Sequence, residues 1–199
     1  MRSWRPRDAA AVHRICLATG DGGEPVHHIL RDPELAAYVF ADPYLLLHPE
    51  LAFVVEGRGT VLGYVVAALH TEEFYARWQL EWSPRFAASH PSGRVVNGRS
   101  GDSQLRAYLH RPRLMLPANL DRYPSHLHIN LVASARGQGM GKQLLHAVFQ
   151  QLACAGSPGV QLGVSPGNTR AHALYQRTGM VRLPSDTRLE VRYGTPLNG

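Results

Sequence analysis

Cysteine is scarce in this chain, with only Cys16 and Cys154 among 199 residues. Two thiols cannot build the disulfide framework of a small secreted domain, and they lack the spacing of a cysteine-based metal site. Both fall within apolar helical patterns, so we predict that both are core residues.

Long apolar runs and blocks of one charge are also missing. No window approaches the 18 apolar residues of a membrane span, and the N-terminus is charged from Arg2 onward, which disfavours a signal peptide. We therefore expect a cytoplasmic protein with no membrane partner. The formal net charge of +6 comes from scattered arginines and not from a dense basic block, so nucleic acid is not an expected partner.

Length and composition favour one compact domain over residues 1–199. With 44% hydrophobic residues, the chain can bury one sizeable core but is short for two domains. The arginine-rich and proline-rich composition gives the impression of a GC-rich bacterial source. The sequence leaves open whether the protein forms a homodimer.

The most informative segment begins as a strand and ends as a helix. Apolar and polar side chains alternate over residues 126–131, which is the period of a strand. From Met140 onward, apolar residues recur at helical spacing as far as residues 156–159. The glycine-rich connection 136–141 thus leads into a helix N-terminus, where free N–H groups and the helix dipole favour an anion. Arg136 would add a fixed cation, so we expect a pyrophosphate here.

Two common nucleotide-binding patterns do not fit this loop. A Walker A loop needs Gly at position 136 and Ser or Thr at position 143, which are Arg136 and Gln143 here. A Rossmann fingerprint needs G-x-G-x-x-G near the start of a fold, whereas these glycines alternate after about two thirds of the chain. The alternatives that remain are an R-x-x-G-x-G anion loop and a glycine-rich turn that binds nothing.

A second strand and a second helix follow. Residues 160–164 form a short apolar strand, and the turn ending at Asn168 can cap a helix from Thr169 to Gly179. Asn168 and Tyr175 are seven positions apart, so they lie on nearly the same side of this helix. An extended ligand could contact both. Alternatively, Asn168 is only an N-cap and Tyr175 a half-buried aromatic residue.

These motifs together resemble the GNAT superfamily of acyl-CoA-dependent N-acetyltransferases. Segments 123–130 and 162–171 are similar to the acetyltransferase-like C-terminal domain of O-GlcNAcase and its free-standing bacterial relatives, and residues 5–16 resemble the first strand and helix of the superfamily. The resemblance implies an α/β fold of the α+β type. This is a single GNAT-like domain with a mixed central sheet, an antiparallel N-terminal half, a βαβα cofactor half at residues 126–179, and helices on both faces.

The resemblance also implies roles for individual residues. The matching Asn contacts the pantetheine chain, the matching Tyr donates a proton to the leaving thiolate, and a backbone N–H near Leu131 or Val132 polarises the thioester carbonyl. The implied cosubstrate is acetyl-CoA, and no metal is implied. The residues that would bind acetyl-CoA are Leu131, Val132, Arg136, Gly137, Gln138, Gly139, Met140, Gly141, Lys142, Asn168 and Tyr175.

The N-terminal half is predicted to supply the acceptor side. We expect helices at 10–17 and 32–39, a hairpin of strands at 51–56 and 61–69, and a helix at 72–82 whose aromatic stripe is more often core than substrate cage. Carboxylates beside aromatic faces would nevertheless suit a cationic amine. Residues 83–113 are expected to form a long loop with a helical piece around 104–110, acting as a lid or simply disordered, within an acceptor-side region 70–113. The acceptor-side candidates are Glu73, Tyr75, Trp78, Glu81 and Asn130.

Acyl transfer to an amine needs a base as well as an acid. His126 and His128 share one face of the predicted strand, so His128 is our candidate base and Tyr175 our candidate acid. Glu73, Glu81 or a chain of waters could act instead, and a preorganised backbone donor could make a dedicated base unnecessary. The two histidines could also be structural or form an H-x-H metal clip, although two further ligands at recognisable spacing are missing.

The sequence therefore predicts an acetyl-CoA-dependent N-acetyltransferase whose unidentified amine acceptor attacks the thioester directly. An acetyl-CoA-binding pseudo-enzyme, or a regulatory or protein-interaction module with this fold, would keep the same motifs. A phosphate-binding regulatory protein, stabilised by ATP and not by acetyl-CoA, is a further hypothesis.

Overall fold

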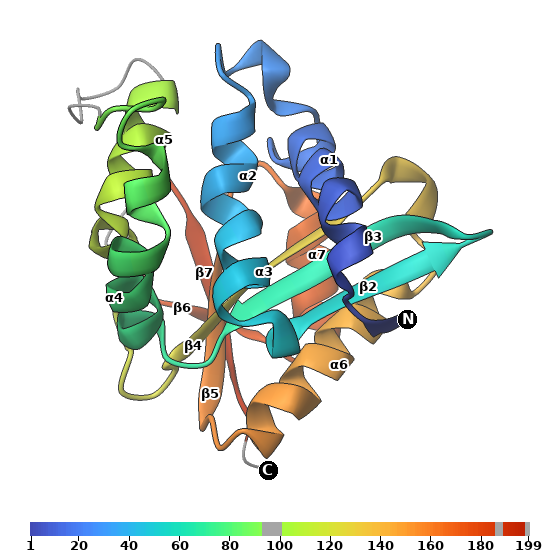
Figure 1. Cartoon of the computed structure of the whole chain (residues 1–199). Coiled ribbons are helices and arrows are strands. Elements are labelled where there is room, and N and C mark those ends of the chain that lie inside the picture. The colour runs from blue at the N-terminus through green and yellow to red at the C-terminus, as the bar shows by residue number, and fades with distance from the viewer. Residues whose placement is uncertain (93–100, 186–188, 198–199) are drawn as a thin grey trace.

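The computed structural model describes residues 1–92, 101–185 and 189–197. These residues form one α/β domain around a seven-stranded sheet of order β1-β2-β3-β4-β5-β7-β6 (Figure 1). The strands are β1 (Arg2–Ser3), β2 (Ala52–Gly57), β3 (Thr60–Ala68), β4 (Ser125–Leu131), β5 (Gly159–Val164), β6 (Val181–Leu183) and β7 (Val191–Pro196). Neighbouring strands pair antiparallel except β4 and β5, which pair in parallel.

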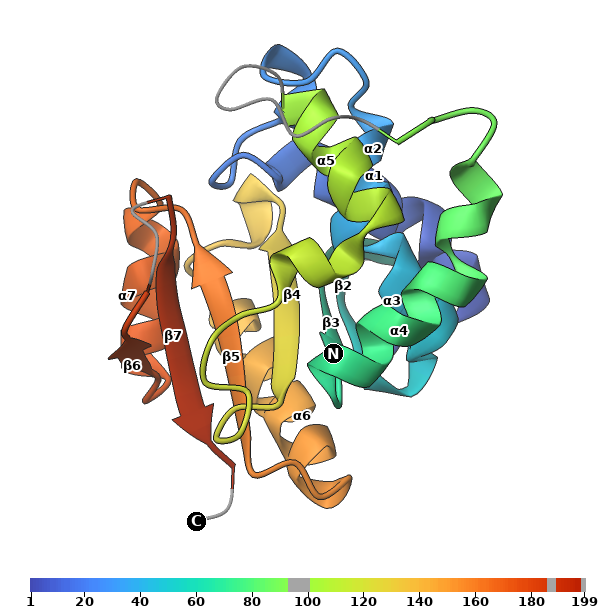
Figure 2. The same cartoon turned by 90° about the vertical axis from the view of Figure 1, so that its left-hand side faces the viewer.

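Helices cover both faces of the sheet (Figure 2). One face carries α1 (Ala9–Thr19), α2 (Glu34–Phe40), α3 (Asp42–Leu47), α4 (Thr71–Glu81) and α5 (Gly101–His110), and the other carries α6 (Met140–Cys154) and α7 (Thr169–Arg177). None of the helices in the described segments is long and apolar enough to span a bilayer.

Two apolar cores result, one on each face. Successive strand residues point to opposite faces, so Tyr64 and Val66 of β3 pack with α1 to α5, whereas Val65 and Ala67 pack with α6 and α7. Three polar residues of β4 lie on the α1 to α5 face, namely His126, His128 and Asn130. His126 is buried beneath these helices, and His128 and Asn130 are partly buried.

The predicted fold class is confirmed, with its mixed sheet, antiparallel N-terminal half and helices on both faces. The strand, loop and helix over 125–154 follow the predicted order, as do the strand and helix over 159–177. Helix α3, and the strands β6 and β7 that complete the C-terminal half, were not predicted. The predicted helical piece around 104–110 is part of α5, whereas the prediction for residues 93–100 falls outside the described residues.

The prediction for the two cysteines is half right. Cys16 is buried on α1, but Cys154 is exposed at the last position of α6. The apolar stripe of this helix passes through Leu144, Leu145 and Leu152, and residue 154 lies on the opposite side.

Candidate active site

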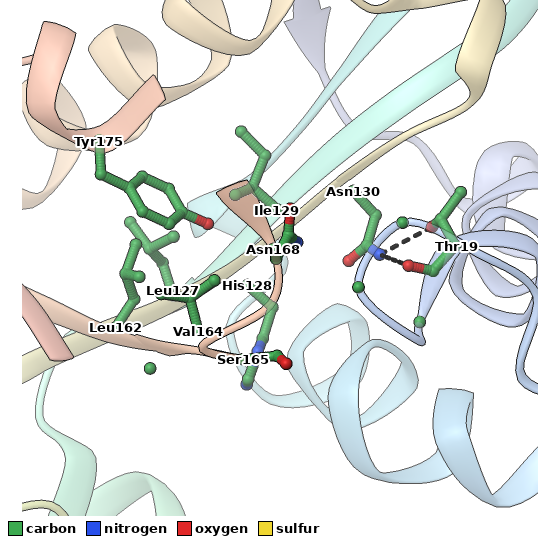
Figure 3. Close-up of a pocket in the computed structure, with 14 residues that line it drawn as sticks. Thr19, Leu127, His128, Ile129, Asn130, Leu162, Val164, Ser165, Asn168 and Tyr175 are labelled. Atoms are coloured by element: carbon green, nitrogen blue, oxygen red, sulfur yellow. Dashed lines mark hydrogen bonds between the residues drawn. The ribbon is translucent and has the colours of Figure 1, made fainter. Parts of the chain in front are cut away.

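A cavity opens where β4 and β5 separate. The two strands pair only at Ser125 with Val160 and at His126 with Gln161, and beyond these positions they diverge. The cavity has a volume of about 160 Å³, and Figure 3 shows its lining converging from β4, β5, α7 and the segment after α1. It is lined by Thr19, Gly20, Gly22, Gly23, Leu127, His128, Ile129, Asn130, Leu162, Gly163, Val164, Ser165, Asn168 and Tyr175.

Backbone N–H groups of β4 point into this gap. In an antiparallel pair, successive N–H groups face opposite edges of the strand. Val132 donates its N–H to the Leu62 carbonyl at 3.0 Å, so the N–H groups of Leu131 and Ile129 face β5, which no longer pairs with β4 there. The prediction that Val132 could supply a free N–H group is therefore wrong, because this N–H is hydrogen-bonded to β3. Leu131 remains a candidate source of a free N–H group, and Ile129 is a second candidate.

The glycine loop has the backbone of an anion site. Gly137 and Gly139 have φ angles of 74° and 76°, a left-handed conformation that Gly adopts without steric penalty. Gly139 caps α6, and the Gln143 N–H makes the first hydrogen bond of the helix, to the Gly139 carbonyl. The amides from 137 to 142 are thus left without intrahelical partners. Lys142 is exposed beside them.

Other side chains of the loop have structural contacts. Gln138 donates to the Ser134 carbonyl at 2.6 Å. Met140 packs against the core beneath α6. Gly141 is buried, and a Cβ there would lie 3.0 Å from Leu174 of α7, so glycine allows α6 and α7 to approach closely.

The sequence predicted that Arg136 places a cation beside the loop amides, but its side chain is directed elsewhere. Its guanidinium donates to the carbonyls of Leu131 at 3.2 Å and Gly23 at 2.5 Å. These bonds join the loop before α6 to the segment after α1, which forms another wall of the cavity. The side chain thus supports the shape of the cavity, because its donors are directed at backbone oxygens.

Asn168 and Tyr175 both line the cavity from α7. Asn168 is the N-cap, and its Oδ1 accepts the Ala171 N–H at 3.1 Å, which leaves the amide NH₂ group for other partners. Tyr175 is buried, and burial raises the pKa of its phenol well above the ordinary value. Its hydroxyl makes no hydrogen bond within the described segments, and Figure 3 shows it directed toward the centre of the cavity. It is a protonated donor without a partner.

The two histidines of β4 are joined through a tyrosine that the sequence did not single out. The Tyr44 hydroxyl on α3 lies 2.7 Å from Nε2 of His126 and 3.0 Å from Nε2 of His128. Nδ1 of His126 lies 2.8 Å from Oγ1 of Thr71 at the start of α4. Desolvation lowers the pKa of His128 to about 4 and that of His126 well below its ordinary value, so both rings are neutral at pH 7.

This network leaves the histidine pair poorly arranged for a metal clip. Both ring nitrogens of His126 and one of His128 are engaged by hydroxyl groups. In the described part of the chain, no three His, Cys, Asp or Glu side chains gather as metal ligands would.

Asn130 supports the neighbouring wall of the cavity. Its amide donates to Oγ1 of Thr19 at 2.7 Å, and its Oδ1 accepts from the Tyr64 hydroxyl at 3.2 Å. Its hydrogen-bonding groups are therefore used to join β4 to the end of α1. Thr19 carries no local motif that would have revealed this contact.

The aromatic stripe of α4 belongs to the core, in line with the more frequent of the two alternatives, and the acceptor-side candidates on this helix do not face the cavity. Tyr75 is 3% exposed and Trp78 is fully buried, with its indole N–H donating to the Leu109 carbonyl at 3.0 Å. Glu73 is exposed, and Glu81 pairs with Arg77 on the outer side of the helix at 2.9 Å. None of the four lines the cavity, because α4 covers the sheet with its aromatic face.

Comparison with known proteins agrees with this geometry. The model of the acetyltransferase (GNAT) family matches residues 20–180. Protein O-GlcNAcase of Rattus norvegicus is 21% identical over 180 residues, which are 90% of this chain and 20% of that protein, so the chain spans about a fifth of this relative's length. The crystal structure of SsHAT is 34% identical with a TM-score of 0.92, over 100% of this chain and 98% of SsHAT.

A more distant structure shares the fold alone. YncA of Salmonella typhimurium, solved with its cofactor acetyl-CoA, is 15% identical with a TM-score of 0.56, over 99% of this chain and 92% of YncA. The family match covers most of the chain, and the chain therefore belongs to the GNAT acetyltransferase family. It is a GNAT-type acyltransferase, and its family supports acetyl transfer as the reaction.

Proposed function

We propose that this protein transfers the acetyl group of acetyl-CoA to an amine, by direct attack of the amine on the thioester. The observation that carries the proposal is the position of the cavity. It is lined from opposite faces of the sheet by His128 and Tyr175, and its wall at Gly23 is joined by a hydrogen bond to Arg136, directly ahead of the 137–142 loop. A diphosphate on the loop amides would direct the thiol arm past Asn168 into the cavity, with residues 126–179 forming the cofactor-binding core.

The cavity supplies a polar group for each change of charge. The nitrogen lone pair of the amine forms a bond to the thioester carbon, while the N–H groups of Leu131 or Ile129 stabilise the oxygen that becomes negative. The C–S bond then breaks and the thiolate accepts a hydrogen bond or a proton from the Tyr175 hydroxyl. The proton lost by the amine nitrogen passes to His128. His128 then releases this proton to solvent, and the Tyr175 phenolate, or a thiolate that left with only a hydrogen bond, takes up one from solvent. The products are the N-acetylated amine and CoA-SH, so atoms and charges balance.

The pKa of His128 limits its role. An imidazole with a pKa of about 4 cannot efficiently deprotonate an alkylammonium group in solution. We infer that the acceptor enters as the neutral amine and that His128 accepts the proton as the C–N bond forms, when the nitrogen becomes far more acidic. This places the requirement for deprotonation on the acceptor and not on the enzyme.

Direct attack is also favoured by the positions of the thiols. Cys16 is buried in the core between α1 and the sheet, and burial raises its thiol pKa to about 12. Cys154 is exposed at the far end of α6. Neither cysteine lines the cavity, so neither is placed to carry the acetyl group as a covalent intermediate.

The test compares ligands and then measures turnover. Acetyl-CoA at about 100 times its Kd should stabilise the fold by about 2.7 kcal/mol, a rise in Tm of roughly 5–10 °C for a chain of this size, whereas ATP should give a much smaller shift. Release of free thiol from acetyl-CoA is then followed against a panel of amines. Equal shifts with ATP and acetyl-CoA would contradict a site that recognises acetyl-CoA. A shift without thiol release for any amine would favour a binding module.

A further inference from the structure

A chain of hydrogen-bonding groups leads from the cavity to the carbonyl oxygen of Pro124, through the apolar core on the α1 to α5 face. Nε2 of His128 contacts the Tyr44 hydroxyl at 3.0 Å, and this hydroxyl contacts Nε2 of His126 at 2.7 Å. Nδ1 of His126 contacts Oγ1 of Thr71 at 2.8 Å, and Oγ1 lies 2.7 Å from the carbonyl oxygen of Pro124. The groups between the cavity and this carbonyl come from β4, α3 and α4.

The final contact determines the direction of every hydrogen bond. A carbonyl oxygen can only accept, so Thr71 must donate its hydroxyl hydrogen to Pro124 and accept from Nδ1–H of His126. The neutral His126 ring then has an unprotonated Nε2, which accepts from the Tyr44 hydroxyl. The oxygen of Tyr44 can now only accept from Nε2–H of His128.

We propose that Tyr44, His126 and Thr71 are positioning residues that hold His128 with its proton on Nε2 and an unprotonated Nδ1 available to a ligand in the cavity. The role of that nitrogen as proton acceptor rests on the proposed function above. Nδ1 of His128 makes no hydrogen bond within residues that the structure describes, and His128 lines the cavity (Figure 3). The other tautomer would present an N–H there, which cannot accept a proton.

The chain is suited to fixing a tautomer and not to conducting protons. It ends on a carbonyl oxygen inside the protein, which cannot release a proton to solvent. Its hydroxyl groups also have little freedom to rotate. Tyr44 is fully buried and stacks on Phe74 with ring centroids 4.5 Å apart, and Thr71 is 1% exposed. Packing alone would be served as well by Phe at position 44 and Val at position 71.

The deciding variants change Thr71, which does not line the cavity. Thr71→Val removes the acceptor for Nδ1–H of His126, and an unpaired buried donor is costly. The His126 proton should move to Nε2, which reverses the bonds of Tyr44 and places the His128 proton on Nδ1. Thr71→Ser retains the hydroxyl and is the matched control.

The primary readout is the ¹⁵N spectrum of histidine-labelled, full-length protein at pH 7.5, with the His128 resonances assigned. Wild type and Thr71→Ser should show a protonated Nε2 and an unprotonated Nδ1, and Thr71→Val the reverse. With acetyl-CoA and an amine that the wild type acetylates, Thr71→Val should lower kcat about 100-fold and change the KM for acetyl-CoA by less than about twofold.

The outcomes separate this inference from the proposed function. A protonated Nδ1 of His128 in the wild type, or an unchanged His128 spectrum in Thr71→Val, overturns the inference whatever the turnover. Absence of turnover for every amine contradicts the proposed function, and the spectra still report the tautomer. If Thr71→Val does not fold, Tyr44→Phe replaces it, because the ring keeps its stacking. An unchanged His128 spectrum in that variant also overturns the inference.

Discussion

At the scale of single residues, the site depends on how burial changes the protonation of a few side chains. Burial favours the uncharged form of every group that it surrounds. It therefore keeps the Tyr175 phenol protonated and the His128 ring unprotonated at pH 7. An acid that holds its proton and a base that lacks one are the states that acyl transfer needs at the start of a cycle.

Replacing Tyr175 by Phe should lower kcat by about 100-fold, because the departing thiolate loses its donor. The KM for acetyl-CoA should change little, since the ring remains in place and the diphosphate contacts are distant. Tyr193→Phe is the matched control, because its ring lies 5.6 Å from that of Tyr175 but its hydroxyl contacts His172. Steady-state kinetics with thiol detection would check both variants, and an unchanged kcat in Tyr175→Phe would remove its assigned role.

At the scale of elements, the loop before α6 and the divergence of β4 from β5 define the candidate cofactor site. Neither depends on a charged side chain. The left-handed glycines turn the chain so that consecutive N–H groups precede the helix, and the divergence leaves strand N–H groups without a partner. The site is thus built largely from backbone, and substitutions that change backbone conformation should affect it most.

Gly139→Ala tests the loop against a control of equal strain. Gly139 and Gly59 both have a φ of 76°, and a Cβ at either position meets nothing within 4 Å. Alanine in this conformation should therefore cost each variant about 1–2 kcal/mol of unfolding free energy. Only Gly139→Ala should weaken acetyl-CoA binding, because Gly59 lies in the hairpin between β2 and β3. Denaturant unfolding and calorimetric titration measure the two effects, and equal affinities would argue against the loop as the diphosphate site.

At the scale of the whole molecule, histidines in opposite environments make stability depend on pH. His126 and His128 have lowered pKa values in the fold, so the unfolded chain binds their protons first as pH falls below about 6.5. Each should reduce the unfolding free energy with a slope of up to about 1.4 kcal/mol per pH unit between pH 6.5 and 4.

His13 has the opposite sign. It lies 2.7 Å from both Asp42 and Glu34, and the hydrogen bond to Asp42 is the main cause of its raised pKa. Its contribution is complete below about pH 6.5 and is lost as pH rises through the raised value. Stability should therefore be greatest near pH 6.5.

Urea unfolding from pH 5 to pH 9 measures this profile. In His13→Gln, the decline above pH 6.5 should shrink while the decline below it remains. A wild-type profile that is flat between pH 6.5 and pH 5 would contradict the neutral state of the buried histidines.

Much of the cofactor half could be predicted because its determinants are local. Alternation along residues 126–131, the glycines of the loop and the helical spacing after Met140 each act over a few residues. The acceptor side could not be predicted in the same way. The aromatic stripe of α4 shows that one helix face is apolar, but not whether it packs on a sheet or faces a ligand, and Trp78 proved to be core.

The sequence by itself therefore determined the order of elements in residues 125–177, the glycine-rich backbone ahead of α6 and the shared side of Asn168 and Tyr175. Only the tertiary structure decided that Tyr44 meets both histidines of β4 across more than 80 positions, and that the Val132 N–H is taken by β3. Local conformation leaves a periodic record in the chain. Contacts between distant segments depend on how packed layers align, and one sequence carries no local pattern for that alignment.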